Sequence, residues 1–333
     1  MRKYWQVSSG SKQRDFSDIF IKYGVFATND DTKTTKYKSL LKEMKEDDIL
    51  ILKKGLNTVI AIGKIKSKKV EEESCYFNFD GWKLNYFKKV DWYLPFNGRE
   101  KFSDRILNQG TISQCHNHEV ITFADKTLKC VTKNIVEFEI QKVSEISDEK
   151  IIETLINNGM KVQQAEIFTS TMLGVRRLAK YYTTKFEWKE INENQVKCFL
   201  VIPLLLALGW SEQQIILEYK LTRQKADIVC LDKPIHLNNH NIKLLIEVKK
   251  LSEGLDFAID QAIDYAKSFN EINENKINTL VLTNGFCYQI YLVNNKNEYV
   301  KNSYINILEL LEKYPSTPES KGALEAIIKL LRI

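Results

Sequence analysis

The hydrophobic pattern of this 333-residue chain changes twice along its length, and these changes restrict the folds open to it. Residues 1–140 hold short apolar runs punctuated by Gly and Asn, a pattern typical of a small β-barrel or half-barrel. From about Ser147, apolar residues recur every three or four positions, which predicts amphipathic helices. After Glu187, helix and strand patterns alternate. We therefore expect an α/β multidomain protein with a β-barrel domain over 1–140, a helical connector over 141–186 and an α/β domain with C-terminal helices over 187–333.

The expected elements follow from this pattern. The first domain is predicted to hold strands over 4–7, 48–52, 58–65, 88–93, 120–123 and 135–140, and helices over 16–23 and 36–46. The connector is predicted to hold helices over 148–157 and 164–182. In the last domain we expect helices over 192–208, 255–269, 305–314 and 323–331, and strands over 214–221, 226–231, 243–249, 279–282 and 288–293. Asn284-Gly285 favours a tight turn between the last two strands.

The charge of the chain is uneven. Residues 1–140 carry 25 Lys and Arg against 19 Asp and Glu, whereas the rest of the chain carries 24 of each. A basic domain suits a polyanion such as nucleic acid, because Lys and Arg neutralise phosphates, although solubility alone would also account for the excess.

Other features bear on location and metals. The longest apolar run, 199–208, is too short for a membrane helix, and the first residues lack the apolar core of a signal peptide. We therefore expect a cytoplasmic protein with no membrane partner. The six cysteines form no C-x-x-C pair, which argues against a disulfide scaffold or a zinc ribbon.

Charged residues interrupt two apolar strands in the last domain. Asp227 lies near the start of one strand, while Glu247 and Lys249 lie two residues apart on another and so share a face. Two neighbouring carboxylates repel unless a cation lies between them, and Mg²⁺ prefers hard oxygen ligands. We therefore predict that Asp227 and Glu247 bind Mg²⁺, with Mn²⁺ as a substitute, and hold a scissile phosphate. An ion pair at a strand end is the alternative.

These residues resemble the PD-(D/E)XK nucleases, and more narrowly the N-terminal nuclease domain of type I restriction enzyme R subunits. The resemblance covers about residues 187–295 and is carried by Glu193, Asp227, Glu247-Val248-Lys249 and Gln261 with Tyr265, in that order. It implies a restriction-endonuclease-like α/β/α core with Asp227, Glu247, Lys249 and Glu193 as catalytic residues. Lys249 would orient or activate water, and Gln261 and Tyr265 would position DNA.

Two departures from that family bear on the prediction. The chain lacks a G-x-x-x-x-G-K-[ST] loop, so cutting is expected to need no ATP or to rely on a motor partner. Glu218 on the first strand competes with Glu193 for the role of the helix carboxylate, a salt bridge being the alternative for Glu218.

The first domain resembles the EVE group of PUA-like domains, which receive a modified base in an aromatic pocket. The resemblance covers about residues 1–125 and rests on 4–8, 53–57, 62–65 and 89–92. It implies that Trp5 and Trp92 stack on the base, with Tyr23 and Tyr37 as alternatives, and that Asp91 accepts a hydrogen bond from a cytosine amine. Alternatively, these aromatic residues form the core of the barrel.

Together the two resemblances imply a modification-dependent DNA endonuclease of the restriction type that acts on double-stranded DNA with a modified base, most simply a substituted cytosine. Because one such site cuts one strand, we expect a homodimer. The alternatives are a non-catalytic nucleic-acid-binding or recruiting subunit with a degenerate nuclease fold, and a structure-specific repair nuclease. RNA is an alternative partner for the first domain.

Overall fold

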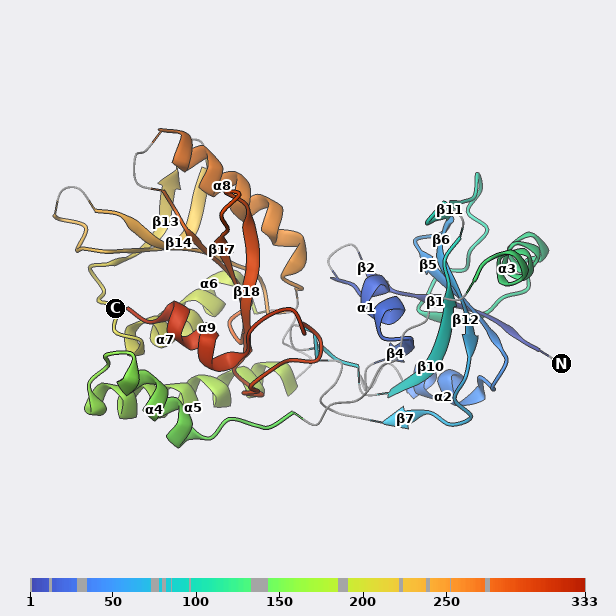
Figure 1. The fold of residues 1–333 in the computed structure, drawn as a ribbon, viewed down its shortest axis with the longest axis horizontal. Coiled ribbons are helices and arrows are strands. Elements are labelled where there is room, and N and C mark those ends of the chain that lie inside the picture. The colour runs from blue at the N-terminus through green and yellow to red at the C-terminus, as the bar shows by residue number, and fades with distance from the viewer. Residues whose placement is uncertain are drawn as a thin grey trace. The chain divides into compact units, whose positions relative to one another are not determined.

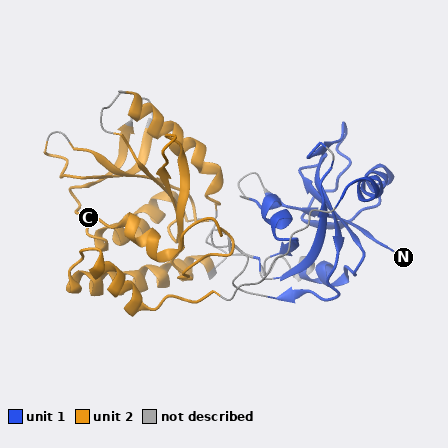
Figure 2. Cartoon of the chain, in the orientation of Figure 1, with its two compact units in different colours: residues 1–141 blue, residues 142–333 orange. Residues whose placement is uncertain are grey.

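The computed structural model describes residues 2–11, 14–28, 35–72, 78–79, 82–84, 86–95, 97–132, 143–184, 191–221, 224–237, 240–251, 253–272 and 276–332. The chain divides into two compact units, unit 1 over residues 1–141 and unit 2 over residues 142–333 (Figure 2). Both units combine helices with a sheet (Figure 1). In the ranges given above, no helix combines the length and apolar character needed to cross a membrane.

Unit 1 is built on a sheet that curls into a half-barrel, with the strand order β12-β1-β5-β6-β10-β4. The strands on this path are β1 (Tyr4–Ser8), β4 (Val25–Thr28), β5 (Ile49–Lys54), β6 (Thr58–Ile65), β10 (Tyr86–Tyr93) and β12 (Ile112–Gln114). Short strands β7 (Glu71–Glu72) and β11 (Glu100–Lys101) pair with β10 and β6. Two-residue strands form the pairs β2 (Gly10–Ser11) with β3 (Arg14–Asp15) and β8 (Asn78–Phe79) with β9 (Trp82–Lys83). The helices are α1 (Ser17–Lys22), α2 (Thr35–Glu43) and α3 (His118–Cys130).

Both faces of strand β5 are buried, which explains its uninterrupted apolar sequence. Ile49 and Ile51 pack in one cluster with Val120 and Ala124 of α3. Leu50 and Leu52 pack in a second cluster that includes residues of α1 and α2. Successive residues of a strand point to opposite faces, so one apolar run supplies two cores.

Most elements predicted for unit 1 are confirmed, but the strand predicted over 120–123 is wrong. These residues belong to α3, whose N-cap Asn117 accepts a hydrogen bond from the backbone N–H of Val120 at 3.1 Å. The buried residues Val120, Ala124 and Thr127 recur at helical spacing. This spacing cannot be seen within residues 120–123 alone, from which the strand is predicted. Strand β4 was not predicted, and the strand predicted over 135–140 lies outside the described residues.

Unit 2 contains a six-stranded sheet in which the strands are neighbours in chain order, from β13 to β18. They are β13 (Ile215–Leu221), β14 (Gln224–Leu231), β15 (Ile242–Val248), β16 (Thr279–Thr283), β17 (Cys287–Val293) and β18 (Tyr299–Asn306). Among the described residues of this sheet, only β15 and β16 pair in parallel. They are connected through a 3₁₀ turn (Asp256–Ala258) and α8 (Ile259–Ile272), since parallel neighbours need a crossover.

The remaining helices of unit 2 are α4 (Asp148–Asn157), α5 (Val162–Thr184), α6 (Glu193–Val196), a π-helical turn (Lys197–Val201), α7 (Ile202–Ala207) and α9 (Ala323–Leu330). The sequence predicts α4 and α5 as a separate connector, but their residues Leu155, Phe168 and Met172 are buried in the core of unit 2. The two helices are therefore part of this unit.

The helix predicted over 305–314 is wrong. Its first residues belong to β18, where Ile305 pairs with Tyr288 of β17, and residues 307–314 form turns, bends and isolated β-bridges. The hydroxyl of Tyr314 accepts hydrogen bonds from the backbone N–H groups of Asn306 and Leu311, which fixes those turns. Pairing with the sheet thus outweighs the local helical spacing of the apolar residues. The other predicted helices and strands of unit 2 are confirmed, and β18 extends the sheet beyond the prediction.

A glycine fixes the helix that follows Glu193 against the sheet. Gly285, in the turn between β16 and β17, has a φ of +93°, which favours glycine. A Cβ atom on Gly285 would lie 2.6 Å from Cδ1 of Leu200 and 2.7 Å from Cγ1 of Val196. The turn therefore touches the segment from Val196 to Leu200, and the absence of a side chain permits this close contact.

We predict that Gly285→Ala lowers the free energy of unfolding of unit 2 by about 2–4 kcal/mol, because it adds both backbone strain and a clash. The matched control is Gly159→Ala, where φ is +92° but nothing lies within 4 Å of the added Cβ. That control should lose only about 1 kcal/mol, measured by urea unfolding. Equal losses in the two variants would contradict the close contact.

Candidate functional site

The central hairpin of unit 2 places the predicted carboxylates opposite each other. Strands β14 and β15 pair antiparallel, with Ile228 opposite Ile246, so the next step of the register sets Asp227 opposite Glu247. Residues Leu244 to Val248 are all buried, which shows that both faces of β15 are covered. The site therefore lies where a covered central strand approaches its end.

Glu247 is the most unusual residue of this site. It is only 3% exposed, and its Oε1 accepts a hydrogen bond from Nζ of Lys249 at 2.6 Å. Its buried Oε2 receives no hydrogen bond from any residue that the structure describes. Burial, followed by the charge of Asp227, raises the pKa of Glu247 from 4.5 to about 7. A buried oxygen without a partner is costly, so Oε2 of Glu247 is available to accept a ligand.

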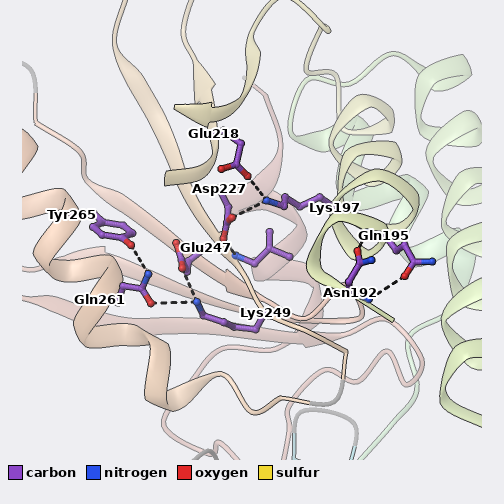
Figure 3. Close-up of polar contacts among 10 residues, drawn as sticks. Asn192, Gln195, Lys197, Glu218, Asp227, Glu247, Lys249, Gln261 and Tyr265 are labelled. Atoms are coloured by element: carbon purple, nitrogen blue, oxygen red, sulfur yellow. Dashed lines mark hydrogen bonds and ion pairs between the residues drawn. The ribbon is translucent and has the colours of Figure 1, made fainter. Parts of the chain in front are cut away.

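Asp227 is held at both of its carboxylate oxygens. Oδ2 accepts a hydrogen bond from the backbone N–H of Val248 at 2.8 Å, and Oδ1 accepts one from Nζ of Lys197 at 2.9 Å (Figure 3). The first bond ties Asp227 to the strand that carries Glu247. The prediction that the Asp227 strand lies beside the strand of Glu247 and Lys249 is confirmed.

Lys197 is a site residue that the sequence alone does not reveal. Its side chain is 6% exposed and lies on the π-helical turn, where Nζ also contacts Oε1 of Glu218 at 2.5 Å. Burial disfavours its charge, but the hydrogen bonds to the two carboxylates outweigh burial and raise the pKa of Lys197. The same contact lowers the pKa of Glu218, which confirms the salt bridge considered for that residue. Its partners Glu218 and Asp227 lie 21 and 30 residues further along the chain, so no local spacing points to it.

The π-helical turn that carries Lys197 has a local cause. Pro203 has no backbone N–H and cannot bond to the carbonyl of Phe199, so the regular helical ladder is interrupted there. Upstream, Asn192 and Gln195 form a capping box that begins α6 at Glu193, with bonds of 2.9 and 3.0 Å. These features set the position of Lys197 along the helix.

Lys249 links Glu247 to helix α8. Its Nζ donates to Oε1 of Gln261 at 3.3 Å, and Nε2 of Gln261 in turn donates to the hydroxyl of Tyr265. Burial opposes the charge of Lys249, yet the hydrogen bond and charge of Glu247 outweigh it, so the pKa of Lys249 is raised. Gln261 and Tyr265 share one helix face, as their spacing predicts, and Gln261 is exposed beside the site.

Glu193 belongs to the same electrostatic group. It is the first residue of α6 and is partly buried. Burial, followed by the charge of Asp227, raises the pKa of Glu193, and Lys249 and Lys197 oppose that shift. Glu193 therefore lies within electrostatic range of the two predicted ligands.

The residues suit a cation that takes few protein ligands. Among the residues described, no group of three or more His, Cys, Asp or Glu side chains is arranged to hold a metal. Mg²⁺ is usually bound through one or two carboxylates and keeps several waters, so Asp227 and the open Oε2 of Glu247 fit its needs.

The residues predicted to form a base pocket in unit 1 have a different setting. Trp5 and Trp92 are each 1% exposed. Their indole N–H groups donate to Asp48 Oδ2 at 3.0 Å and to the carbonyl of Val25 at 3.2 Å. The alternative that these rings form the barrel core therefore describes both tryptophans, and neither presents a face on which a base can stack.

The other predicted pocket residues differ in exposure. Tyr23 is 8% exposed and also belongs to the core. Asp91 is partly exposed and contacts Nζ of Lys66 at 3.4 Å. The side chain of Tyr37 lies outside the described part of the structure.

In comparisons with known proteins, no family model matches this chain, and no curated protein matches it.

We predict that the ionisation of Glu247 destabilises the metal-free protein. Because its folded pKa of about 7 exceeds the ordinary 4.5, the folded state binds more protons between these values. The free energy of unfolding of the wild type, relative to Glu247→Gln, should therefore fall as the pH rises from 4.5 to 7 and level off above 8. Chemical unfolding of both proteins in EDTA at several pH values measures this difference. A difference that does not change with pH would contradict the assignment.

Proposed function

We propose that this chain is a Mg²⁺-dependent endonuclease that hydrolyses phosphodiester bonds of double-stranded DNA. The observation that carries the proposal is the unpartnered Oε2 of the buried Glu247, beside Asp227 and Lys249. The order and spacing of the residues, from Glu193 to Tyr265, support a PD-(D/E)XK nuclease and the restriction-endonuclease-like fold that this implies.

Each residue of the site would have a distinct role in this reaction. Asp227 and Glu247 would hold Mg²⁺, which when bound supplies positive charge to a phosphate oxygen and lowers the pKa of water. Lys249 orients Glu247 through its hydrogen bond at 2.6 Å, and its charge would offset charge that develops on the phosphate. Gln261, which bonds to Lys249 and Tyr265, would contact the DNA backbone at the exposed edge of the site. Glu193 would add negative charge that attracts the cation.

Unit 1 would supply affinity for DNA and select its modification. Its excess of Lys and Arg supports binding to phosphates, and its resemblance to EVE domains supports recognition of a modified cytosine. Since Trp5 and Trp92 are buried, that recognition would fall to other residues of the unit. A homodimer would allow two sites to cut both strands.

A specific observation favours a second candidate function, a non-catalytic DNA-binding or recruiting subunit. Lys197 and Lys249 pair with Asp227 and Glu247 at 2.9 and 2.6 Å, so lysines alone offset part of the carboxylate charge. A degenerate nuclease fold would keep such ion pairs and need no metal.

We predict that Glu247→Gln and Asp227→Asn each reduce DNA cleavage in Mg²⁺ by at least about a hundredfold, because loss of a direct ligand should cost no less than loss of a supporting residue. EDTA should abolish wild-type cleavage. Glu166→Gln, an exposed carboxylate on α5, is the control and should cut as the wild type does. Cleavage that survives Glu247→Gln would contradict the proposal.

The selection of a modified base is tested in the same assay. Matched duplexes would carry cytosine, 5-methylcytosine, 5-hydroxymethylcytosine or its glucosylated form. We predict cutting of one modified duplex in preference to the unmodified one. Uniform cutting would contradict base selection and leave a general or structure-specific nuclease, while absence of cutting in every duplex would favour the non-catalytic subunit.

A further inference from the structure

Lys197 shares its ammonium group between two carboxylates of different exposure. The side chain of Asp227 is 16% exposed and that of Glu218 is 51% exposed, while Lys197 itself is 6% exposed. A buried ammonium is costly unless it is paired, so Lys197 needs at least one of these partners at all times. Glu218 lies beside solvent and Asp227 lies beside the candidate metal ligand Glu247.

The contacts of Asp227 leave little room for a second cation. Its Oδ2 is bonded to the backbone N–H of Val248 at 2.8 Å, and Lys197 takes Oδ1 at 2.9 Å. A divalent ion bound to Asp227 and to the open Oε2 of Glu247 would lie close to the ammonium of Lys197. Like charges repel strongly where water is scarce, so the two cations compete for the same carboxylate.

The backbone places Glu218 to receive the ammonium. Leu217 pairs with Ile228 and Tyr219 with Ala226, so Glu218 lies opposite Asp227 in the hairpin of β13 and β14. Glu218 has a φ of +51°, a conformation that is strained for a residue other than glycine. This strained residue makes the 2.5 Å contact with Lys197. The helix itself is fixed by the turn at Gly285, so movement of the ammonium would come from the flexible lysine side chain.

We propose that Lys197 is a resident counter-ion of Asp227 that a divalent cation displaces, and that Glu218 is the carboxylate that retains the displaced ammonium. The inference rests on the proposed metal site of Asp227 and Glu247. Lys197 and Glu218 are positioning residues in this account, since each acts on the metal through Asp227. The exchange lets the site fold without metal and sets how tightly it binds metal.

The test measures binding of Mn²⁺ by loss of the free-ion EPR signal, with purified full-length protein and no DNA. Lys197→Met should strengthen Mn²⁺ binding by about threefold or more, because the competing charge is gone. Glu218→Gln should weaken binding by about twofold, because Lys197 then depends on Asp227 alone. Lys150→Met removes the same charge from an exposed ion pair on α4 and should leave binding unchanged.

The double variant separates displacement from a simple effect of charge. If Glu218 acts through Lys197, then Glu218→Gln should have no effect on Mn²⁺ binding in the Lys197→Met background. An unchanged effect of Glu218→Gln in that background would show direct action and overturn the proposal, as would equal or weaker binding by a folded Lys197→Met variant.

Two further outcomes distinguish failure of the Lys197 displacement from failure of the proposed metal site. If Lys197→Met does not fold, the single variant Glu218→Gln still decides, and unchanged Mn²⁺ binding there would overturn the displacement. If the wild type itself binds no Mn²⁺ at this site, as judged by comparison with Glu247→Gln, the proposed metal site fails and the displacement fails with it. If the wild type binds Mn²⁺ at this site but Lys197→Met does not strengthen that binding, the displacement alone is overturned and the metal site stands.

Discussion

Like charges repel most strongly where water is excluded, and the structure of unit 2 brings the carboxylates of Asp227 and Glu247 together at such a place. They lie on neighbouring antiparallel strands, and Glu247 is 3% exposed. Two lysines offset the charge, Lys197 at Asp227 and Lys249 at Glu247. Oε2 of Glu247 still has no partner among the described residues, and the pKa of this carboxyl is raised to about 7. In our proposal, a divalent cation offsets the remaining negative charge.

The surrounding fold serves to hold these charges in place. Glu247 is held by the buried strand β15, and Asp227 is held by its hydrogen bond from the backbone N–H of Val248. The turn at Gly285 packs closely against the helical segment that carries Lys197. Helix α8 adds Gln261, which holds Lys249 from the other side. Each contact joins elements distant in sequence, so the geometry of the site depends on the whole sheet of unit 2 and not on a local motif.

The sequence predicts much of this arrangement because the signals are local. The two-residue spacing of Glu247 and Lys249 places both on one face of a strand, and the four-residue spacing of Gln261 and Tyr265 places both on one face of a helix. Lys197 escaped prediction because its partners, Glu218 and Asp227, lie 21 and 30 residues further along the chain.

The prediction of a base pocket places the tryptophans of unit 1 in the wrong setting, because the sequence does not show which aromatic side chains are buried. The resemblance to EVE domains implies an aromatic pocket, but only packing reveals that Trp92 fills the space above Gly63, where an added Cβ would lie 2.7 Å from its ring.

The most direct test of this metal site is a crystal structure of the protein grown or soaked with Mn²⁺, with anomalous diffraction used to locate the ion. We predict an anomalous peak in bonding contact with Oε2 of Glu247 and with the carboxylate of Asp227, and its loss in Glu247→Gln. A peak elsewhere with Oε2 still unpartnered, or no peak at a Mn²⁺ concentration that supports cleavage, would contradict the claim that these two carboxylates form the metal site.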